Sequence, residues 1–198
     1  MLDRSTYFIR EHVGLLKLQN VYDILDPATG QQIGVAAEEA SALVAFLRLV
    51  LGRRLLPTTV RVYAGNAPGI RSKLVFSMEK GFSFLRTRID VRDKRGISVG
   101  GLVSRLLTVG GAVDMQNERG MPVASLEGNW IGWNFTYYDP SGLAIGQATK
   151  KWAGIGKELF TTADNYIVSL SVTRGERTVA LFLAAVLAVD LIYKESDD

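Results

Sequence analysis

The stretch TVALFLAAVLAVDLIY, residues 178–193, decides how this chain folds. It is apolar on every helical face, and a helix of this kind lies either in a membrane or in the centre of a protein. Crossing a bilayer takes about 20 apolar residues, whereas the uninterrupted run covers only residues 179–189 before Asp190. A carboxylate at that depth in lipid costs at least ~2.5 kcal/mol. The sequence therefore predicts a helix buried inside the protein.

Both ends of this run have features of helix termini. Thr173 and Glu176 have the spacing of a capping box, in which two side chains satisfy backbone N–H groups at a helix start. Asp190 and Lys194 are four residues apart and are expected to pair on one face. We therefore expect a central helix over about residues 176–194, which the rest of the chain must surround.

Length and composition favour one globular domain. A length of 198 residues fits a single domain over residues 1–198, since all-β barrels often reach this size. The net charge of +3 is too small to indicate a nucleic-acid partner by itself. The chain has no cysteine, which excludes disulfides and thiolate metal sites. Residues 1–14 carry charges throughout and lack the apolar core of a signal peptide, so we expect a cytoplasmic protein.

Repeated β-hairpins dominate the rest of the chain. Short runs of alternating polarity flank turns that open with Asp or Asn and close with Gly, at residues 26–30, 93–96, 117–120 and 139–142. The last three closing glycines are 22–24 residues apart, and such a period indicates repeated supersecondary units. A sheet of this kind must close or be covered at its edges. The predicted strands are residues 7–10, 15–18, 21–25, 32–36, 60–63, 73–76, 88–92, 97–100, 112–116, 121–124, 134–138 and 143–146.

One segment departs from the strand pattern. Residues 38–51, EEASALVAFLRLVL, begin with two acids and precede Gly52 and two arginines, which is the charge distribution of a helix. One interpretation is an outer helix packed over a side or mouth of a barrel. The alternative is a membrane-surface helix in which Arg48, Arg53 and Arg54 contact lipid phosphates.

A second basic patch is the Lys-Lys-Trp block at residues 150–152, with Lys157 nearby. Two lysines beside an indole suit anionic head groups, with the indole at the membrane interface. The structural alternative places the two lysines on opposite faces of a strand and the Trp over the barrel core. Trp130 and Trp133 also face opposite sides if extended, so one of them is expected in the core.

The sequence shows no recognisable catalytic site. His12 is the only histidine and lies among charged residues, so we expect it at the surface or a strand edge. One histidine and no cysteine exclude Cys–His catalysis and a histidine metal cluster. There is no phosphate-binding loop or nucleophile elbow, and Gly100-Gly101 and Gly110-Gly111 are interpreted as strand bends or bulges. We expect a protein that is not an enzyme.

Four longer stretches resemble one known family. They are YFIREHVGLLKLQNVYDILDP (residues 7–27), LPTTVRVY (56–63), GFSFLRTRIDV (81–91) and KKWAGIGKELFTTADNYIVSL (150–170). Through them the chain resembles the phospholipid scramblase-related family, which belongs with the LURP-one-related and Tubby-like C-terminal domains. The resemblance covers nearly the whole chain. It implies a mainly β fold, a closed antiparallel β-barrel of about twelve strands around a buried hydrophobic C-terminal helix.

The resemblance also identifies a candidate calcium segment. Calcium-binding members of the family carry an acidic segment just before the helix, which aligns with residues 162–173, TADNYIVSLSVT. This chain keeps Asp164 and Asn165 but has Thr at both ends, where those members have Asp. Ca²⁺ takes six to eight oxygen ligands, usually including several carboxylates. Asp164 and Asn165 are therefore only a weak calcium site, and no cofactor is expected.

The favoured function is a non-enzymatic cytoplasmic module that binds a membrane surface, anionic phospholipid or a protein partner, with the inner face of the plasma membrane as one expected place. The first alternative is a genuine scramblase, which requires residues 178–193 in the bilayer. The second is a nucleic-acid-binding regulatory protein, suggested by a pI near 9.2 but unsupported by any recognition helix or stacking motif. The expected lipid or partner contacts are Arg48, Arg53, Arg54, Lys150, Lys151, Trp152 and Lys157.

Overall fold

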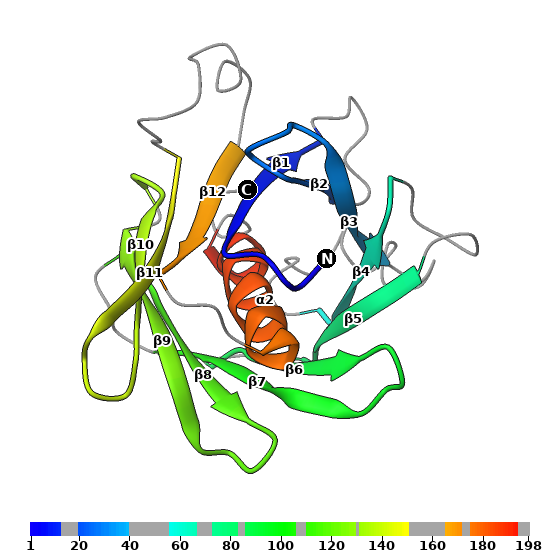
Figure 1. Cartoon of the computed structure of the whole chain (residues 1–198). Helices are drawn as coiled ribbons and strands as arrows, with labels where there is room; N and C mark the ends of the chain where they lie inside the picture. The colour runs from blue at the N-terminus through cyan, green and yellow to red at the C-terminus, as the bar shows by residue number, and fades with distance from the viewer. Residues whose placement is uncertain are drawn as a thin grey trace.

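The computed structural model describes residues 1–12, 20–39, 56–66, 73–82, 86–105, 110–129, 131–150, 165–171 and 175–193. These residues form a closed barrel of twelve antiparallel strands, in which β1 pairs with β12 to complete the wall (Figure 1). The mainly β fold predicted from the sequence is confirmed. The strands are β1 (Thr6–Glu11), β2 (Val21–Leu25), β3 (Gln32–Glu39), β4 (Thr58–Ala64), β5 (Lys73–Lys80), β6 (Arg88–Asp93), β7 (Ser98–Ser104), β8 (Ala112–Asn117), β9 (Pro122–Asn129), β10 (Asn134–Tyr138), β11 (Ala144–Thr149) and β12 (Asn165–Leu170).

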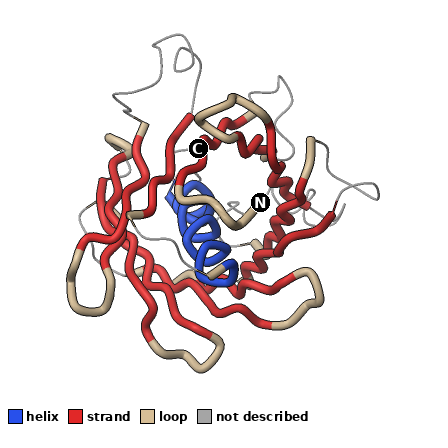
Figure 2. Tube along the Cα trace, viewed as in Figure 1, coloured by secondary structure: helices blue, strands red, loops and turns tan. Residues whose placement is uncertain are grey.

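The helix α2 (Glu176–Tyr193) occupies the interior of the barrel, as predicted (Figure 2). Every side chain in residues 179–189 is at most 3% exposed. The helix packs most closely against β7, with β6 and β8 beside it. In the described part of the chain, no helix has both the length and the uncharged apolar character that crossing a membrane requires. The predicted capping residue Thr173 and the predicted partner Lys194 lie outside the described residues.

Alternation along the strands gives the barrel an apolar inner face and a polar outer face. In β2, Tyr22 and Ile24 belong to the core, so Asp23 between them points outward. Its Oδ2 accepts a hydrogen bond of 2.7 Å from Arg10 Nη2 and lies 2.7 Å from His12 Nε2. The His12 side chain is 53% exposed, which confirms its predicted position at the surface.

Three hairpin turns share one construction. Asp93, Asn117 and Asp139 open the β6–β7, β8–β9 and β10–β11 turns. The side-chain oxygen of each accepts hydrogen bonds from the backbone N–H groups two and four residues later, at distances of 2.8–3.0 Å. The closing glycine of each turn has φ between 76° and 87°, a conformation that glycine adopts without strain. The predicted turn chemistry is confirmed.

The glycine pair in β7 marks an irregularity in the sheet, as predicted. The β6–β7 ladder shifts register where Gly100 pairs with Val91, and Gly100 has φ of 149°. A Cβ atom at this position would lie 2.1 Å from the Gln116 carbonyl oxygen of β8. Glycine is therefore required here by the close approach of β8 as well as by backbone conformation.

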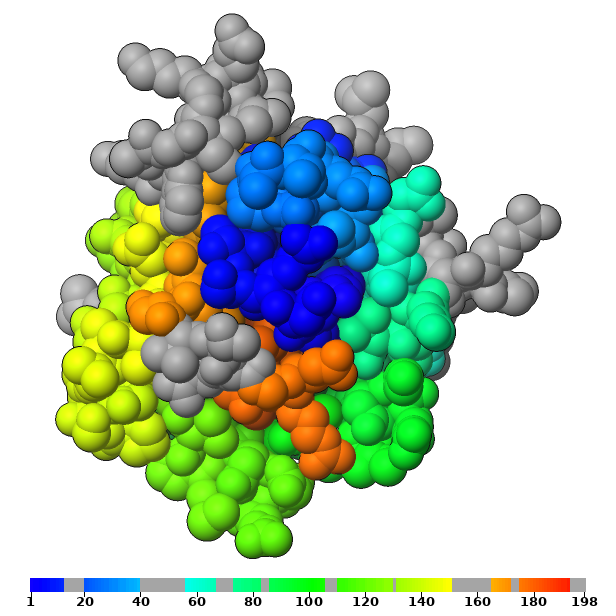
Figure 3. Space-filling view, viewed as in Figure 1, coloured from blue at the N-terminus to red at the C-terminus, as the bar shows by residue number. Residues whose placement is uncertain are grey.

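The two ends of the barrel differ. One end, which we call the turn end, carries the tight turns after β2, β6, β8 and β10, the first turn of α2 and residues 1–5 (Figure 3). At the other, the loop end, strands β1, β3, β5, β7, β9 and β11 finish. The helix ends near the loop end. This is shown by Tyr22, at the start of β2, which donates a hydrogen bond to Asp190 near the end of α2.

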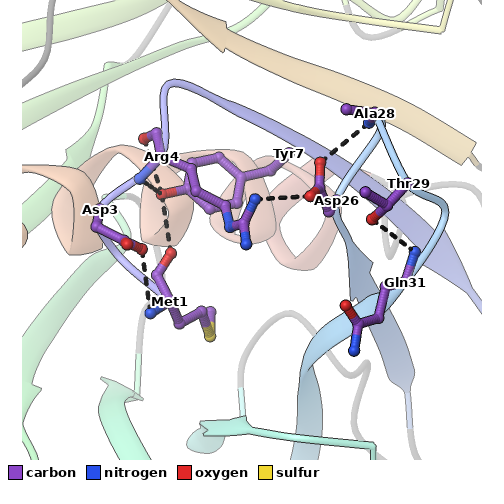
Figure 4. A network of polar contacts seen from close by, with 8 residues as sticks. All are labelled: Met1, Asp3, Arg4, Tyr7, Asp26, Ala28, Thr29 and Gln31. Carbon is purple, nitrogen blue, oxygen red and sulfur yellow. Dashed lines mark hydrogen bonds and ion pairs between the residues drawn. The ribbon is translucent and has the colours of Figure 1, made fainter.

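A polar network fixes residues 1–7 across the turn end (Figure 4). The Tyr7 hydroxyl donates to the Arg4 carbonyl oxygen at 2.9 Å, and Arg4 Nη1 lies 2.7 Å from Asp26 Oδ2. Asp26 also accepts a hydrogen bond from the Ala28 N–H at 3.0 Å. That bond is the main cause that lowers the pKa of Asp26. Burial raises the pKa of Tyr7 to about 12, so this hydroxyl stays a donor.

The predicted outer helix is wrong at its start. Glu38 and Glu39 are the last residues of β3 rather than the first turn of a helix. Glu38 pairs with Val60 of β4, and its N–H donates to the Asn20 carbonyl oxygen at 2.9 Å. Pairing on both sides of β3 outweighs the local preference of two acids for a helix start. The remainder of the predicted helix, residues 40–51, and the predicted strand 15–18 lie outside the described residues.

Candidate functional site

Most of the predicted contact residues lie outside the described part of the chain. Of the expected lipid contacts only Lys150 is described, and of the two calcium candidates only Asn165 is. The residues outside the description are Arg48, Arg53, Arg54, Lys151, Trp152, Lys157 and Asp164. The barrel nevertheless shows where their segments are attached. Residues 40–55 follow β3 and precede β4, and residues 151–164 follow β11 and precede β12. All four strand termini lie at the loop end, so both basic segments join the same end of the barrel.

Lys150 lies against the β9–β10 turn at this end. It directly follows the last residue of β11. The structural alternative, with Lys150 and Lys151 on opposite faces of a strand and Trp152 over the barrel core, stays a prediction, because Lys151 and Trp152 lie outside the described residues. The Lys150 Nζ lies over the ring of Trp133, 5.4 Å from the ring centre, as in a cation–π interaction. The Lys150 backbone N–H also donates to the Trp133 carbonyl oxygen at 3.1 Å. Both contacts hold the Lys150 ammonium at one place on the loop end.

Trp133 is in turn held by other aromatic rings. It stacks on Tyr166 with ring centres 4.5 Å apart and an angle of 22°, and it meets Phe135 edge to face at 5.9 Å. Contacts of this kind contribute roughly 0.5–1.5 kcal/mol beyond burial. Trp133 is 7% exposed and has φ of 46°. It is therefore a core tryptophan, as one of the pair was predicted to be, but it lies in a turn. Two residues before it, Ile131 is 78% exposed.

A buried hydrogen bond joins the barrel wall to α2 at the loop end. The Tyr22 hydroxyl donates to the Asp190 carboxylate, and both residues are at most 2% exposed. Burial, and then the negative charge of Asp190, raise the pKa of Tyr22. The phenol therefore stays protonated and remains a donor. The sequence predicts only a pair between Asp190 and Lys194, because two residues 168 positions apart leave no local signal.

Asn165, the described half of the calcium candidate, is part of the barrel wall. It begins β12, pairs with Arg10 of β1 and is 5% exposed. Among the residues that the structure describes, no group of three or more His, Cys, Asp or Glu side chains is arranged to hold a metal ion.

A cavity of about 630 Å³ lies on the outer wall beside β8, β9 and β10. Arg105 lines this cavity and donates hydrogen bonds of 2.8 Å to Asp114 Oδ1 and to Glu127 Oε1. The bond to Asp114 is the main cause that raises the pKa of Arg105. Ser125 Oγ donates to Glu127 as well, at 2.8 Å. Arg105 is therefore already engaged by two carboxylates and is not available to an anionic ligand.

The scramblase family model matches residues 14–196, which includes the whole of β2 through α2. No curated protein and no solved structure matches the chain. The matched range contains eleven of the twelve strands of the barrel, the enclosed helix and both basic segments, and it agrees with the resemblance found in the sequence. The chain belongs to the scramblase family.

Proposed function

We propose that this scramblase-family chain is a non-enzymatic module that binds anionic phospholipid at a membrane surface with its loop end. The observation that carries the proposal is the placement of Lys150 over Trp133, close to the exposed Ile131. Both basic segments are attached at the same end. Family membership supports a lipid ligand. The proposed contacts are Arg48, Arg53, Arg54, Lys150, Lys151, Trp152 and Lys157.

The proposed binding combines charge with a small apolar contact. Near an anionic membrane each Lys or Arg contributes about 1 kcal/mol, so several cations on one end of the barrel add up to useful affinity. The Trp133 ring holds the Lys150 ammonium in place, which lowers the entropy lost when Lys150 meets a phosphate. Ile131 adds an apolar side chain that is already exposed.

The position of α2 favours surface binding over insertion of the helix. Its apolar side chains are packed inside the barrel, and burial of about eleven such residues is worth roughly 15–30 kcal/mol before ordering entropy. Moving α2 into a bilayer would leave the apolar inner face of the barrel without a partner. In vesicles with fluorescent lipids, we expect the protein to bind without moving lipids between leaflets faster than protein-free vesicles do.

Flotation with vesicles tests the proposal. The intact chain is expected to float with phosphatidylserine vesicles at low salt, but not at high salt or with phosphatidylcholine alone, because salt screens exposed charges. Lys150→Glu combined with Lys151→Glu is expected to weaken binding about tenfold or more, which corresponds to about 1.4 kcal/mol.

The matched control is Arg95→Glu combined with Arg119→Glu, which changes the net charge equally at exposed turns of the opposite end. It is expected to keep most of the binding. If both double variants lose the same amount, binding depends on net charge alone and the loop end has no special role.

A further inference from the structure

A second cavity opens at the turn end, where four parts of the chain meet. They are the N-terminal residues, β5, the β6–β7 turn and the first turns of α2 (Figure 3). We call it the mouth cavity, and its volume is about 400 Å³. Lys150, the predicted contact residue that the structure describes, does not line it.

The wall of the mouth cavity is largely apolar. Leu74 and Val75 of β5 are half-buried and line it together with the buried Phe76, Val99 and Ala180. These side chains come from β5, β7 and α2, and three of them belong to the barrel core. Apolar walls with a few convergent polar groups are typical of sites that bind small ligands.

The rim of the mouth cavity is basic. Lys73, Lys94 and Arg177 line it and are exposed, and none of them is ion-paired with another described residue. The rim also carries Glu176 and Asp93, but Asp93 Oδ1 already accepts hydrogen bonds from its own turn at 2.8 and 3.0 Å. Burial by itself would raise the pKa of Asp93. The two hydrogen bonds and the positive charge of Arg177 outweigh burial, so the pKa of Asp93 is lowered. The rim therefore carries three cations and two carboxylates, and the Asp93 carboxylate is largely engaged by its own turn, which leaves a net positive rim.

Exposed apolar side chains lie at the tips of neighbouring hairpins. Ile97, Met121 and Leu143 each follow the closing glycine of one of the three equivalent turns, and they are 50%, 49% and 64% exposed. Single exposed apolar residues are common on protein surfaces. These three occupy the same turn position on consecutive hairpins of the turn end.

We infer that the mouth cavity binds the anionic head group of a phospholipid-like amphiphile. Lys73, Lys94 and Arg177 bind the phosphate, and the apolar wall receives the carbons next to it. The volume limits what enters, because 400 Å³ holds roughly a dozen groups of the ~30 Å³ that one water occupies. That is enough for a head group and its first carbons but too little for two acyl chains. The rest of the acyl chains stays outside the cavity. This site is separate from the loop end.

Titration of the intact chain with dihexanoyl phosphatidic acid below its micelle concentration tests the inference. We expect saturable binding that shifts the methyl NMR signals of Val75, Val99 and Ala180. Inorganic phosphate is expected to bind at least tenfold more weakly, and dihexanoyl phosphatidylcholine likewise. Lys73→Glu combined with Lys94→Glu is expected to weaken phosphatidic acid binding at least tenfold. Val75→Gln is expected to weaken it without changing the affinity for inorganic phosphate.

Matched controls separate this site from general charge and from the loop end. Arg95→Glu with Arg119→Glu gives the same charge change outside the cavity and should keep binding of phosphatidic acid. Lys150→Glu with Lys151→Glu should also keep it, while reducing flotation with vesicles. The inference is overturned if the two turn-end double variants lose binding equally, or if phosphate binds as tightly as the amphiphile. It is overturned too if the three methyl signals do not move.

Discussion

Two tyrosine hydroxyls connect the helix to the barrel wall. Tyr22 donates to the Asp190 carboxylate near the end of α2, and Tyr137 of β10 donates to the Phe182 carbonyl oxygen at 2.8 Å near its start. Apolar packing alone allows a smooth helix to rotate or slide, since hydrophobic contact has no direction. Two buried hydrogen bonds near opposite ends of the helix therefore fix its rotation and depth.

Replacement of Tyr22 by Phe is expected to destabilise the protein by about 2–3 kcal/mol, because it removes a buried hydrogen bond to a carboxylate. The substitution also affects the pH dependence. Since the pKa of Tyr22 is raised in the folded chain, the folded state keeps a proton that the unfolded state loses above pH about 10. The free energy of unfolding of the wild type therefore falls as pH rises past that value, and Tyr22→Phe reduces this slope.

Urea unfolding at neutral pH and at a series of alkaline pH values measures both effects. Tyr138→Phe is the matched control. Its ring is only half-buried, beyond the core position Tyr137, and a change there should stay within about 0.5 kcal/mol. Equal stability of Tyr22→Phe and the wild type would show that Tyr22 does not position α2.

At the level of strands and turns, glycine has two distinct roles. In the three equivalent hairpin turns it supplies a positive φ and has open space around it; a Cβ atom at Gly120 would meet nothing within 4 Å. In β7 the same residue type allows strand β8 to approach, and a Cβ atom at Gly100 would collide with the Gln116 carbonyl oxygen. The sequence indicates a turn at Gly120 and a strand bend or bulge at Gly100, but it gives no sign of the close approach of β8.

Alanine substitution separates these roles. Gly120→Ala is expected to cost about 1–2 kcal/mol, the strain of a left-handed conformation. Gly100→Ala should cost more, by about 1–3 kcal/mol, because a backbone collision is added to an unfavourable φ. Thermal unfolding of both variants provides the comparison. A Gly100→Ala variant as stable as Gly120→Ala would mean that β7 and β8 can separate without penalty.

For the molecule as a whole, features that depend on neighbouring residues could be predicted from the sequence, whereas contacts between distant residues could not. The apolar run of α2 and the Asp/Asn-x-x-Gly turns are visible in sequence because each depends on neighbouring residues. Glu38 and Glu39 are misleading, since their charge pattern indicates a helix while their strand partners, Val60 and Thr59, are distant in sequence. The contact between Lys150 and Trp133 joins two connections of the barrel. The rim of the mouth cavity is formed by β5, the β6–β7 turn and α2. These elements are distant in sequence and come together only in the closed barrel.

The enclosure of α2 predicts a pattern of amide hydrogen exchange. Residues 181–189 are expected to exchange only through global unfolding, since opening part of the wall does not free a helix packed on all sides. Exchange should be equally slow with and without phosphatidylserine vesicles. Faster exchange of this helix on binding to vesicles would show that it leaves the barrel, and would support lipid translocation over surface binding.

Closure of the wall between β1 and β12 has a consequence for the way the chain is made. The first strand pairs with the last one, and the helix that fills the interior follows both. A ribosome synthesises the chain from its N-terminus, so eleven of the described strands emerge before the strand that completes the wall. Their inner faces stay without a partner until α2 has also been released. Contacts of such long sequence separation form slowly. We therefore expect the nascent protein to expose the apolar residues of its strands for most of its synthesis, and its yield in cells to rise when chaperones cover them until the C-terminal segment arrives.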